Sequence, residues 1–225
     1  MQSKSAVPFP VRLKPAHLML ALVSAALLLL APAARAQFSA PETTHVLDAS
    51  ALRPPAGVHV AMIEFYDLEC PVCAQTNPTL IAAANQYKIP WIRHDFLIPY
   101  HIWSRQAAIN ARYFDATKGQ KVGNDYRDYV MANQTSIETM PQLNQWTQRF
   151  AQAHGISMPF AVDPMGRFAA EVDADVALGK RVGVTHTPTV FIVASGGRAP
   201  QYTEVTEPRT RLFQTIDQVM AEAKR

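Results

Sequence analysis

Apolar runs and amphipathic segments alternate along most of the chain. Residues 58–66 (VHVAMIEFY) are apolar and rich in strand-forming residues, and a Pro-Pro-Ala-Gly break precedes them. Residues 74–87 follow with Leu80 and Tyr87 on one helical face, and residues 89–97 (IPWIRHDFL) are again typical of a strand. The first half of the chain is therefore predicted to form a strand–helix–strand unit.

Four further segments place apolar residues at helical spacing before the pattern returns to strands. A Thr-Pro-Thr sequence then opens a second apolar run, and a Gly-Gly pair predicts a hairpin turn before a final amphipathic segment. The predicted helices are 102–118, 122–133, 142–153, 168–182 and 209–223. This order predicts a mixed α/β protein with a block of helices between two strand-bearing parts.

The N-terminal segment has the organisation of an export signal. It is cationic up to residue 17, and residues 18–31 (LMLALVSAALLLLA) form an uncharged apolar run. That run is shorter than the roughly 20 residues that a membrane-spanning helix needs. Ala34 and Ala36 give the small-x-small pattern of a cleavage site. We expect residues 1–36 to be removed and the mature chain to begin at Gln37 in the periplasm; an uncleaved anchor is the alternative.

Composition and charge exclude two classes of protein. With 48% hydrophobic and 17% charged residues, the chain is too apolar to be disordered. The formal net charge of +3 comes from the N-terminal segment, which holds four of the 21 basic residues and no acid. The remaining chain has 17 basic and 18 acidic residues, so it lacks the positive surface charge expected of a nucleic-acid-binding protein.

The chain has two cysteines, Cys70 and Cys73, in a Cys-Pro-Val-Cys sequence. A disulfide between them closes a ring too small to restrict much of the unfolded chain, so it is a poor structural staple. A structural zinc site needs about four ligands, and the histidines form no pair at three- or four-residue spacing. The pattern favours redox chemistry over an inert disulfide or a metal site, and it requires no metal or other cofactor.

The position of the pair supports that interpretation. Cys70 is predicted to lie where a strand leads into a helix, with Pro71 at the first helical position. Backbone N–H groups and the helix dipole favour a thiolate there. Cys73, one turn inside the helix, is expected to be shielded from solvent. An exposed low-pKa sulfur beside a protected resolving sulfur is what thiol–disulfide exchange requires, so both cysteines are predicted to be catalytic.

Two segments resemble the motifs of the DsbA-like thiol:disulfide oxidoreductases of the thioredoxin superfamily. They are residues 64–73 (EFYDLECPVC) and residues 183–193 (GVTHTPTVFIV). The resemblance implies a thioredoxin fold with a helical domain inserted between the CxxC-bearing strand–helix–strand unit and a strand that opens with a cis-proline. The implied parts are an extension at 37–57, a thioredoxin-like domain at 58–99 and 183–225, and an inserted helical domain at 100–182.

The resemblance also implies roles for three residues outside the cysteine pair. Glu64 would lie beneath the disulfide and relay protons, with a pKa raised toward neutrality by burial; an outward-facing strand glutamate is the alternative. Pro188 would follow a cis peptide bond and turn the Thr187 backbone toward an extended substrate, whereas a trans turn proline is the alternative. His186 is expected to be a surface residue. The three tryptophans are expected in the core.

The surroundings of Cys70 predict a moderate oxidant. Asp67 and Glu69 are expected to be exposed carboxylates that oppose ionisation of Cys70. Val72 offers the thiolate no side-chain donor, unlike the histidine found between the cysteines of the strongest oxidants of the family. Both features leave the direction of electron flow open.

The sequence predicts a monomeric periplasmic oxidase that passes its Cys70–Cys73 disulfide to exported proteins with free thiols. A quinone-linked membrane partner would reoxidise it, as the resemblance implies. A reductase or isomerase reduced by a membrane electron donor is the alternative, although residues 37–57 are too short for the dimerisation domain of the dimeric isomerases. A non-catalytic binding module or chaperone is a further alternative.

Overall fold

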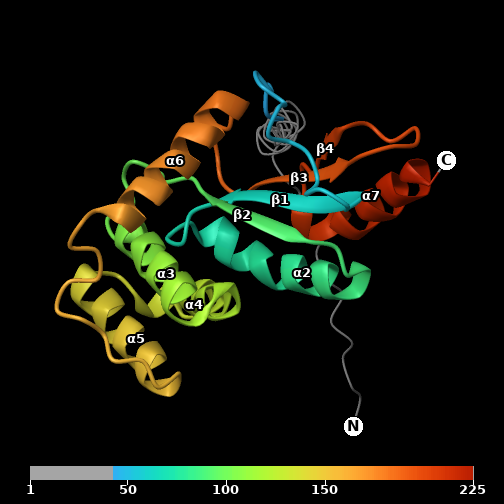
Figure 1. Cartoon of the computed structure of the whole chain (residues 1–225). Coiled ribbons are helices and arrows are strands. Elements are labelled where there is room, and N and C mark those ends of the chain that lie inside the picture. Colours follow the sequence, from blue (N-terminus) through green and yellow to red (C-terminus); the bar gives the residue numbers. More distant parts are fainter. Residues whose placement is uncertain (1–42, 225) are drawn as a thin grey trace, which may run out of the picture. The chain divides into compact units, whose positions relative to one another are not determined.

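The computed structural model describes residues 43–224 (Figure 1). The expected export signal and its cleavage before Gln37 lie outside these residues. Within them, no helix is long and apolar enough to cross a membrane. The elements are β1 Val60–Tyr66, α2 Pro71–Tyr87, β2 Trp91–Asp95, α3 Ser104–Lys118, α4 Gln120–Ala132, the short 3-10 helix η1 Gln134–Ser136, α5 Met140–Ala153, α6 Arg167–Val182, β3 Thr189–Ala194, β4 Tyr202–Glu204 and α7 Pro208–Ala223.

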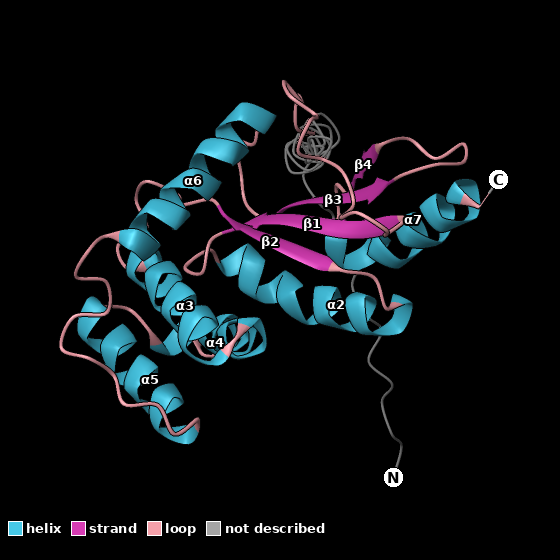
Figure 2. Cartoon of the chain, viewed as in Figure 1, coloured by secondary structure: helices cyan, strands magenta, loops and turns pink. Residues whose placement is uncertain are grey.

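One four-stranded sheet has the order β2-β1-β3-β4 (Figure 2). β1 pairs with β2 in parallel, and α2 makes the crossover; the pairs β1–β3 and β3–β4 are antiparallel. Every residue of β1 and β3 is buried, which explains why both segments are almost continuously apolar. Glu64 is the one charged residue in β1, although it is buried like the others. It is opposite Arg93 on one neighbouring strand and Val190 on the other.

The two faces of the sheet are covered by different helices. Val60 and Met62 share a core with residues of α2 and α7, which lie together on one side of the sheet (Figure 1). Ala61, Ile63 and Phe65 point the other way, into a core that contains Val182 at the end of α6. Because side chains alternate along a strand, Glu64 belongs to the face that α2 covers.

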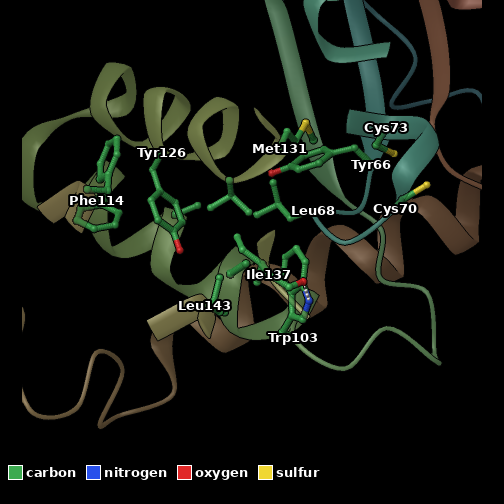
Figure 3. Packing of buried hydrophobic residues seen from close by; sticks show 14 of the residues in the cluster. Tyr66, Leu68, Cys70, Cys73, Trp103, Phe114, Tyr126, Met131, Ile137 and Leu143 are labelled. Atoms are coloured by element: carbon green, nitrogen blue, oxygen red, sulfur yellow. Dashed lines mark hydrogen bonds between the residues drawn. The ribbon is translucent and has the colours of Figure 1, made fainter. Parts of the chain in front are cut away.

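The helices between β2 and β3 form a third core that reaches the cysteines. Phe114, Tyr126 and Leu143 are fully buried in it, and the same cluster includes Cys70 and Cys73 (Figure 3). The last of these helices, α6, contacts both α3 and β2, so it packs against the sheet as well as the bundle. The CxxC segment therefore lies where sheet and bundle meet.

The predicted fold class is confirmed, and the differences are at the element ends. The first strand begins at Val60 rather than at residue 58, and the second shrinks from 89–97 to 91–95. The first helix begins three residues earlier than predicted because Cys70 serves as its N-cap and Pro71 already has helical geometry. The helix η1 was not predicted; one of its side chains matters for the site described below.

α6 approaches the sheet closely at Gly179. A methyl group on Gly179 would come within 2.4 Å of the Phe96 ring and 3.2 Å of the Phe65 ring. In an open helix, Gly→Ala stabilises by roughly 0.5–1 kcal/mol. Here we expect Gly179→Ala to lower the free energy of unfolding by about 1–2 kcal/mol, because overpacking outweighs the gain in helix propensity. Denaturant unfolding measures this change, and a stabilised variant would contradict the close packing of α6.

Candidate active site

Both cysteines lie in the first turn of α2. Cys70 is the N-cap residue, with extended backbone angles, and its carbonyl accepts from the backbone N–H of Ala74. The structure holds both residues as free thiols. Cys70 is 7% exposed and Cys73 is 0% exposed, so the expected exposed sulfur is in fact mostly buried, although it is the more accessible of the two. Both cysteines lie at the edge of the apolar cluster formed by the bundle (Figure 3), and the Thr187 carbonyl contacts the Cys70 thiol.

A loop 117 residues away in sequence lies beside Cys70. The Cys70 thiol donates a hydrogen bond to the Thr187 carbonyl at 3.4 Å, and the Thr187–Pro188 peptide bond is cis. A groove of about 570 Å³ next to the pair is lined by Val72, Thr187 and Pro188, with half-buried His186 at its edge. The structure thus brings Thr187 and Pro188 to the cysteines.

The two thiols have very different acidities. A hydrogen bond from the Cys73 side chain lowers the pKa of Cys70 to about 6, against the opposing effect of burial. The Thr187 hydroxyl and the backbone N–H groups of Cys73 and Val72 make smaller contributions to the same lowering. The Thr187 hydroxyl oxygen has no partner beside the neutral thiol, so it is free to donate once Cys70 ionises. Burial raises the pKa of Cys73 well above its usual value, and the negative charges of Cys70 and Glu64 add to that effect.

The expectation that Asp67 and Glu69 are exposed charges opposing Cys70 is wrong. Asp67 is 1% exposed, and its carboxylate accepts from the backbone N–H groups of Glu69 at 2.7 Å and Ile98 at 2.8 Å. Glu69 accepts from the backbone N–H of Trp103 at 2.6 Å and of Ser104 at 3.0 Å. Its charge therefore satisfies free donors at the start of α3. Both carboxylates are committed to joining the cysteine loop to the bundle.

Gln134 of η1 holds the same loop from the other side. Its side-chain amide donates to the carbonyls of Leu68 at 2.9 Å and Cys70 at 3.1 Å. Sequence reasoning missed this residue, because a glutamine between two helices carries no signal of its own. Its partners become visible only once the bundle is placed against the loop.

Glu64 is completely buried on the face of the sheet that α2 covers. The Trp91 indole donates to its carboxylate at 3.2 Å, and Nε of Arg93 lies 3.7 Å from the same oxygen. Burial raises the pKa of Glu64 to about 7, although the charge of Arg93 and the Trp91 hydrogen bond oppose the shift. Trp91 is half-buried and in contact with this acid rather than a simple core residue; Trp103 is buried as expected, and Trp146 is half-buried.

Four buried side-chain atoms in the described part of the chain have no hydrogen-bond partner. They are Glu64 Oε1, Arg93 Nε, His101 Nδ1 and Thr187 Oγ1. Of these, His101 Nδ1 still lies 3.0 Å from Asp67 Oδ2 in an ion-pair contact, so three atoms are left without a polar neighbour at short range: those of Glu64 and Arg93 beneath α2, and that of Thr187 beside Cys70. Unpaired buried polar atoms are rare and costly, so their concentration around one pair of thiols marks a functional site. No cluster of three or more metal-ligating side chains occurs among residues 43–224.

The comparisons with known proteins agree with this geometry. Three solved structures share 16–18% identity with the chain: alpha-DsbA1 of Wolbachia pipientis, DsbA2 of Pseudomonas aeruginosa, and a periplasmic thioredoxin-like protein of Salmonella enterica. They superpose with TM-scores of 0.60, 0.54 and 0.58, over 76%, 80% and 78% of this chain and 91%, 96% and 94% of theirs.

At the level of sequence, no curated protein matches the chain. A family model described as thioredoxin matches residues 56–205, a span that begins just before β1 and ends just after β4. It contains the strand that carries Glu64, both cysteines and the cis-proline. The chain belongs to the thioredoxin family, and its fold is similar to that of the DsbA proteins.

Proposed function

We propose that this chain is a periplasmic thiol:disulfide oxidase that donates its Cys70–Cys73 disulfide to exported proteins with free thiols. The observation that carries the proposal is the contrast between the two cysteines, one with a pKa of about 6 and one with a strongly raised pKa. A stabilised Cys70 thiolate favours the reduced enzyme, and a disulfide whose reduced form is stabilised is readily given away.

The reaction balances with two substrate thiols and no cofactor. A substrate thiolate attacks Cys70 Sγ, forming a mixed disulfide, while the Cys70–Cys73 bond breaks and Cys73 leaves as a thiolate that takes up a proton. A second substrate thiolate then attacks the substrate sulfur of the mixed disulfide, and Cys70 leaves as its thiolate. Two electrons pass from the substrate to the enzyme. A quinone-linked membrane oxidase would take them up and restore the disulfide.

Glu64 is the proposed proton relay for Cys73. A carboxyl group with a pKa of about 7 is half protonated near neutral pH, so it can supply a proton to the departing Cys73 thiolate and later recover it. The electrostatic influence of Glu64 on Cys73 supports that assignment. Asp67, the other fully buried acid near the cysteines, is instead engaged by backbone N–H groups.

Thr187 and Pro188 are the proposed substrate-binding residues. They border the groove beside the cysteines, where an extended segment could pair with the exposed backbone in the manner of an added strand. Val72 is 47% exposed at the same rim and provides an apolar contact.

A reductase is the alternative, and Val72 is the observation in its favour, since it gives the Cys70 thiolate no side-chain donor. In that case electrons would enter from a membrane donor and pass to substrate disulfides by the reverse of the same steps.

Periplasmic location and a monomeric state are part of the proposal. The location rests on the export-signal pattern of residues 1–36 and on the similarity to a periplasmic thioredoxin-like protein, and the monomeric state rests on residues 37–57, which are too short for the dimerisation domain of the dimeric isomerases.

Trapping of the mixed disulfide tests the proposed mechanism. In Cys73→Ala, the Cys70 thiolate can still attack a disulfide of an exported protein, forming a mixed disulfide and releasing one protein thiolate; because Cys73 is absent, it cannot resolve this adduct, so thiol-sensitive adducts with exported proteins should accumulate. Cys70→Ala should accumulate few, because Cys73 is fully buried and its pKa is raised. Gels run with and without reductant, followed by mass spectrometry, measure both outcomes.

The identity of the trapped proteins separates oxidase from reductase. Many cysteine-containing exported proteins support the oxidase, whereas an inner-membrane electron donor as the main adduct supports the reductase. The Cys70→Ala/Cys73→Ala double variant is the control for non-specific association. If neither single variant forms adducts, thiol exchange is not the function.

Glu64→Gln tests the buried acid through the pH dependence of stability. The pKa of Glu64 is raised from 4.5 to about 7 on folding, so ionising this group costs folding free energy that grows as pH rises between these values. Glutamine removes the cost while keeping an acceptor for Trp91. The variant should therefore gain stability above about pH 7, by up to roughly 3 kcal/mol, and gain little below about pH 4.

The same substitution should slow thiol exchange near neutral pH, since Cys73 loses its proton relay. Denaturant unfolding at several pH values and the rate of exchange with a cysteine-containing peptide measure the two effects. An unchanged exchange rate would remove Glu64 from the mechanism, and a pH-independent stability difference would contradict its raised pKa.

A further inference from the structure

Arg93 links the buried acid to the helical bundle. Its side chain is 4% exposed, and Nη2 donates to Asp128 Oδ1 at 2.7 Å and to the Asn77 side chain. The guanidinium carbon lies 3.5 Å from the centre of the Trp91 ring, which fixes the plane of the group. Arg93 therefore reaches from β2, past α2, to α4.

The Arg93 guanidinium group forms no hydrogen bond with Glu64, the residue opposite it on β1. Its contact with Glu64 is a 3.7 Å approach of Nε, and that Nε has no hydrogen-bond partner. Arginine and a carboxylate ordinarily form two parallel hydrogen bonds at shorter distances. Here Nη2, which a bidentate pair with Glu64 would need, donates to Asp128 and Asn77 instead, and Glu64 Oε1 is left unpaired.

Asp128 is the outer end of this chain of contacts. Its side chain is 32% exposed, and Oδ1 also accepts from Asn77 Nδ2 at 3.1 Å. A surface groove of about 570 Å³ is lined by Asp128, Arg93 and Trp91. Asp128 thus contacts solvent on one side and Arg93 on the other. It lies 64 residues after Glu64 in the sequence.

The charged and titratable groups around Glu64 are few. Beyond Arg93 on β2 and Asp128 on α4, they are the thiols of Cys70 and Cys73 on α2. The partner of Glu64 on β3 is the apolar Val190, and the residues of α7 in the neighbouring core are apolar. The electrostatic field at the Glu64 carboxyl group is therefore set by the positive charge of Arg93 and the negative charge of Asp128.

We propose that Asp128 is a positioning residue for thiol exchange: it holds the Arg93 guanidinium away from a full ion pair with Glu64 and so keeps a proton on that carboxyl near neutral pH. The inference rests on the proposed function of Glu64 as proton relay. The packing of α4 on α2 then contributes to the chemistry, because the Asp128 carboxylate on α4 influences the protonation of Glu64, which lies beneath the two cysteines of α2.

The sign of the effect follows from the charges. The negative charge of Asp128 raises the pKa of Glu64, and the positive charge of Arg93 lowers it. Removing Asp128's charge releases Arg93 to pair with Glu64, so both changes favour ionised Glu64. At neutral pH less of the acid would then hold the proton that Cys73 needs.

The test is a titration of the Glu64 carboxyl carbon by ¹³C NMR in the oxidised protein, where no thiol titrates beside it. Glu64→Gln identifies the signal. Asp128→Asn should lower the titration midpoint by on the order of half a pH unit, about threefold in the protonation constant. Asp128→Ser is a second neutral replacement and should shift the midpoint in the same direction, so the result does not depend on one variant folding.

Two matched variants separate position from net charge. Asp125→Asn removes a carboxylate from the same helix, but Asp125 pairs with Lys121 and not with Arg93, so the Glu64 midpoint should stay at the wild-type value. Asp128→Glu keeps the charge and should restore it. The pH profile of the exchange rate should move to lower pH in Asp128→Asn by the same amount as the midpoint.

An unchanged Glu64 midpoint in both neutral variants, or an equal shift in Asp125→Asn, would overturn the proposal. The titration needs no enzymatic activity, so it is decided separately from the proposed function. A wild-type protein that fails to exchange thiols with a peptide contradicts the oxidoreductase proposal, whereas an active wild-type protein with an unmoved Glu64 midpoint contradicts only the role of Asp128.

Discussion

A charge on Cys70 has to be stabilised at a position that is almost closed to water. Burial by itself opposes the thiolate, and it does so strongly at Cys73, where few donors compensate. At Cys70 the compensation comes from the Cys73 thiol, the Thr187 hydroxyl and two backbone N–H groups of the first turn of α2. Three of these donors belong to α2, and the fourth comes from the distant cis-proline loop. The chemistry therefore depends on the sheet, which brings the end of β1 and the start of β3 together.

The bundle is tied to the cysteine loop by polar contacts rather than by apolar packing alone. Glu69 binds the first backbone N–H groups of α3, Asp67 binds the segment before it, and Gln134 binds two carbonyls of the loop. Beneath the loop, Arg93 and Asp128 make a further connection to α4. The contacts of Glu69, Gln134 and Arg93 cross between the sheet-bearing part and the inserted helices, so the loop has little freedom to move independently of either. Such preorganisation suits a thiolate whose stability depends on precisely aimed donors.

The sequence predicted the elements and the cysteine site because both have local signals. Apolar runs and helical spacing located every major helix and strand, and the resemblance of residues 64–73 to a family motif implied that Glu64 is a buried acid. The partners of that acid were not predictable, since Arg93 and Asp128 look like ordinary surface charges until β2 and α4 are placed. Asp67 and Glu69 were misjudged for the same reason: the N–H groups that engage them lie 31 to 35 residues away. Local sequence patterns are enough to predict helices and strands, whereas the hydrogen-bond partners of buried charged groups depend on tertiary contacts.

The central claim is that the fold stabilises a Cys70 thiolate despite its burial. The most direct measurement is a pH titration of the reduced protein, followed by the ultraviolet absorbance of the thiolate and by the rate of alkylation at Cys70. We expect one reactive thiol, Cys70, to ionise with a pKa of about 6 and Cys73 to stay unreactive over the same range. A first ionisation near the ordinary cysteine value of about 8.5 would show that burial prevails over the donors, and it would contradict the account.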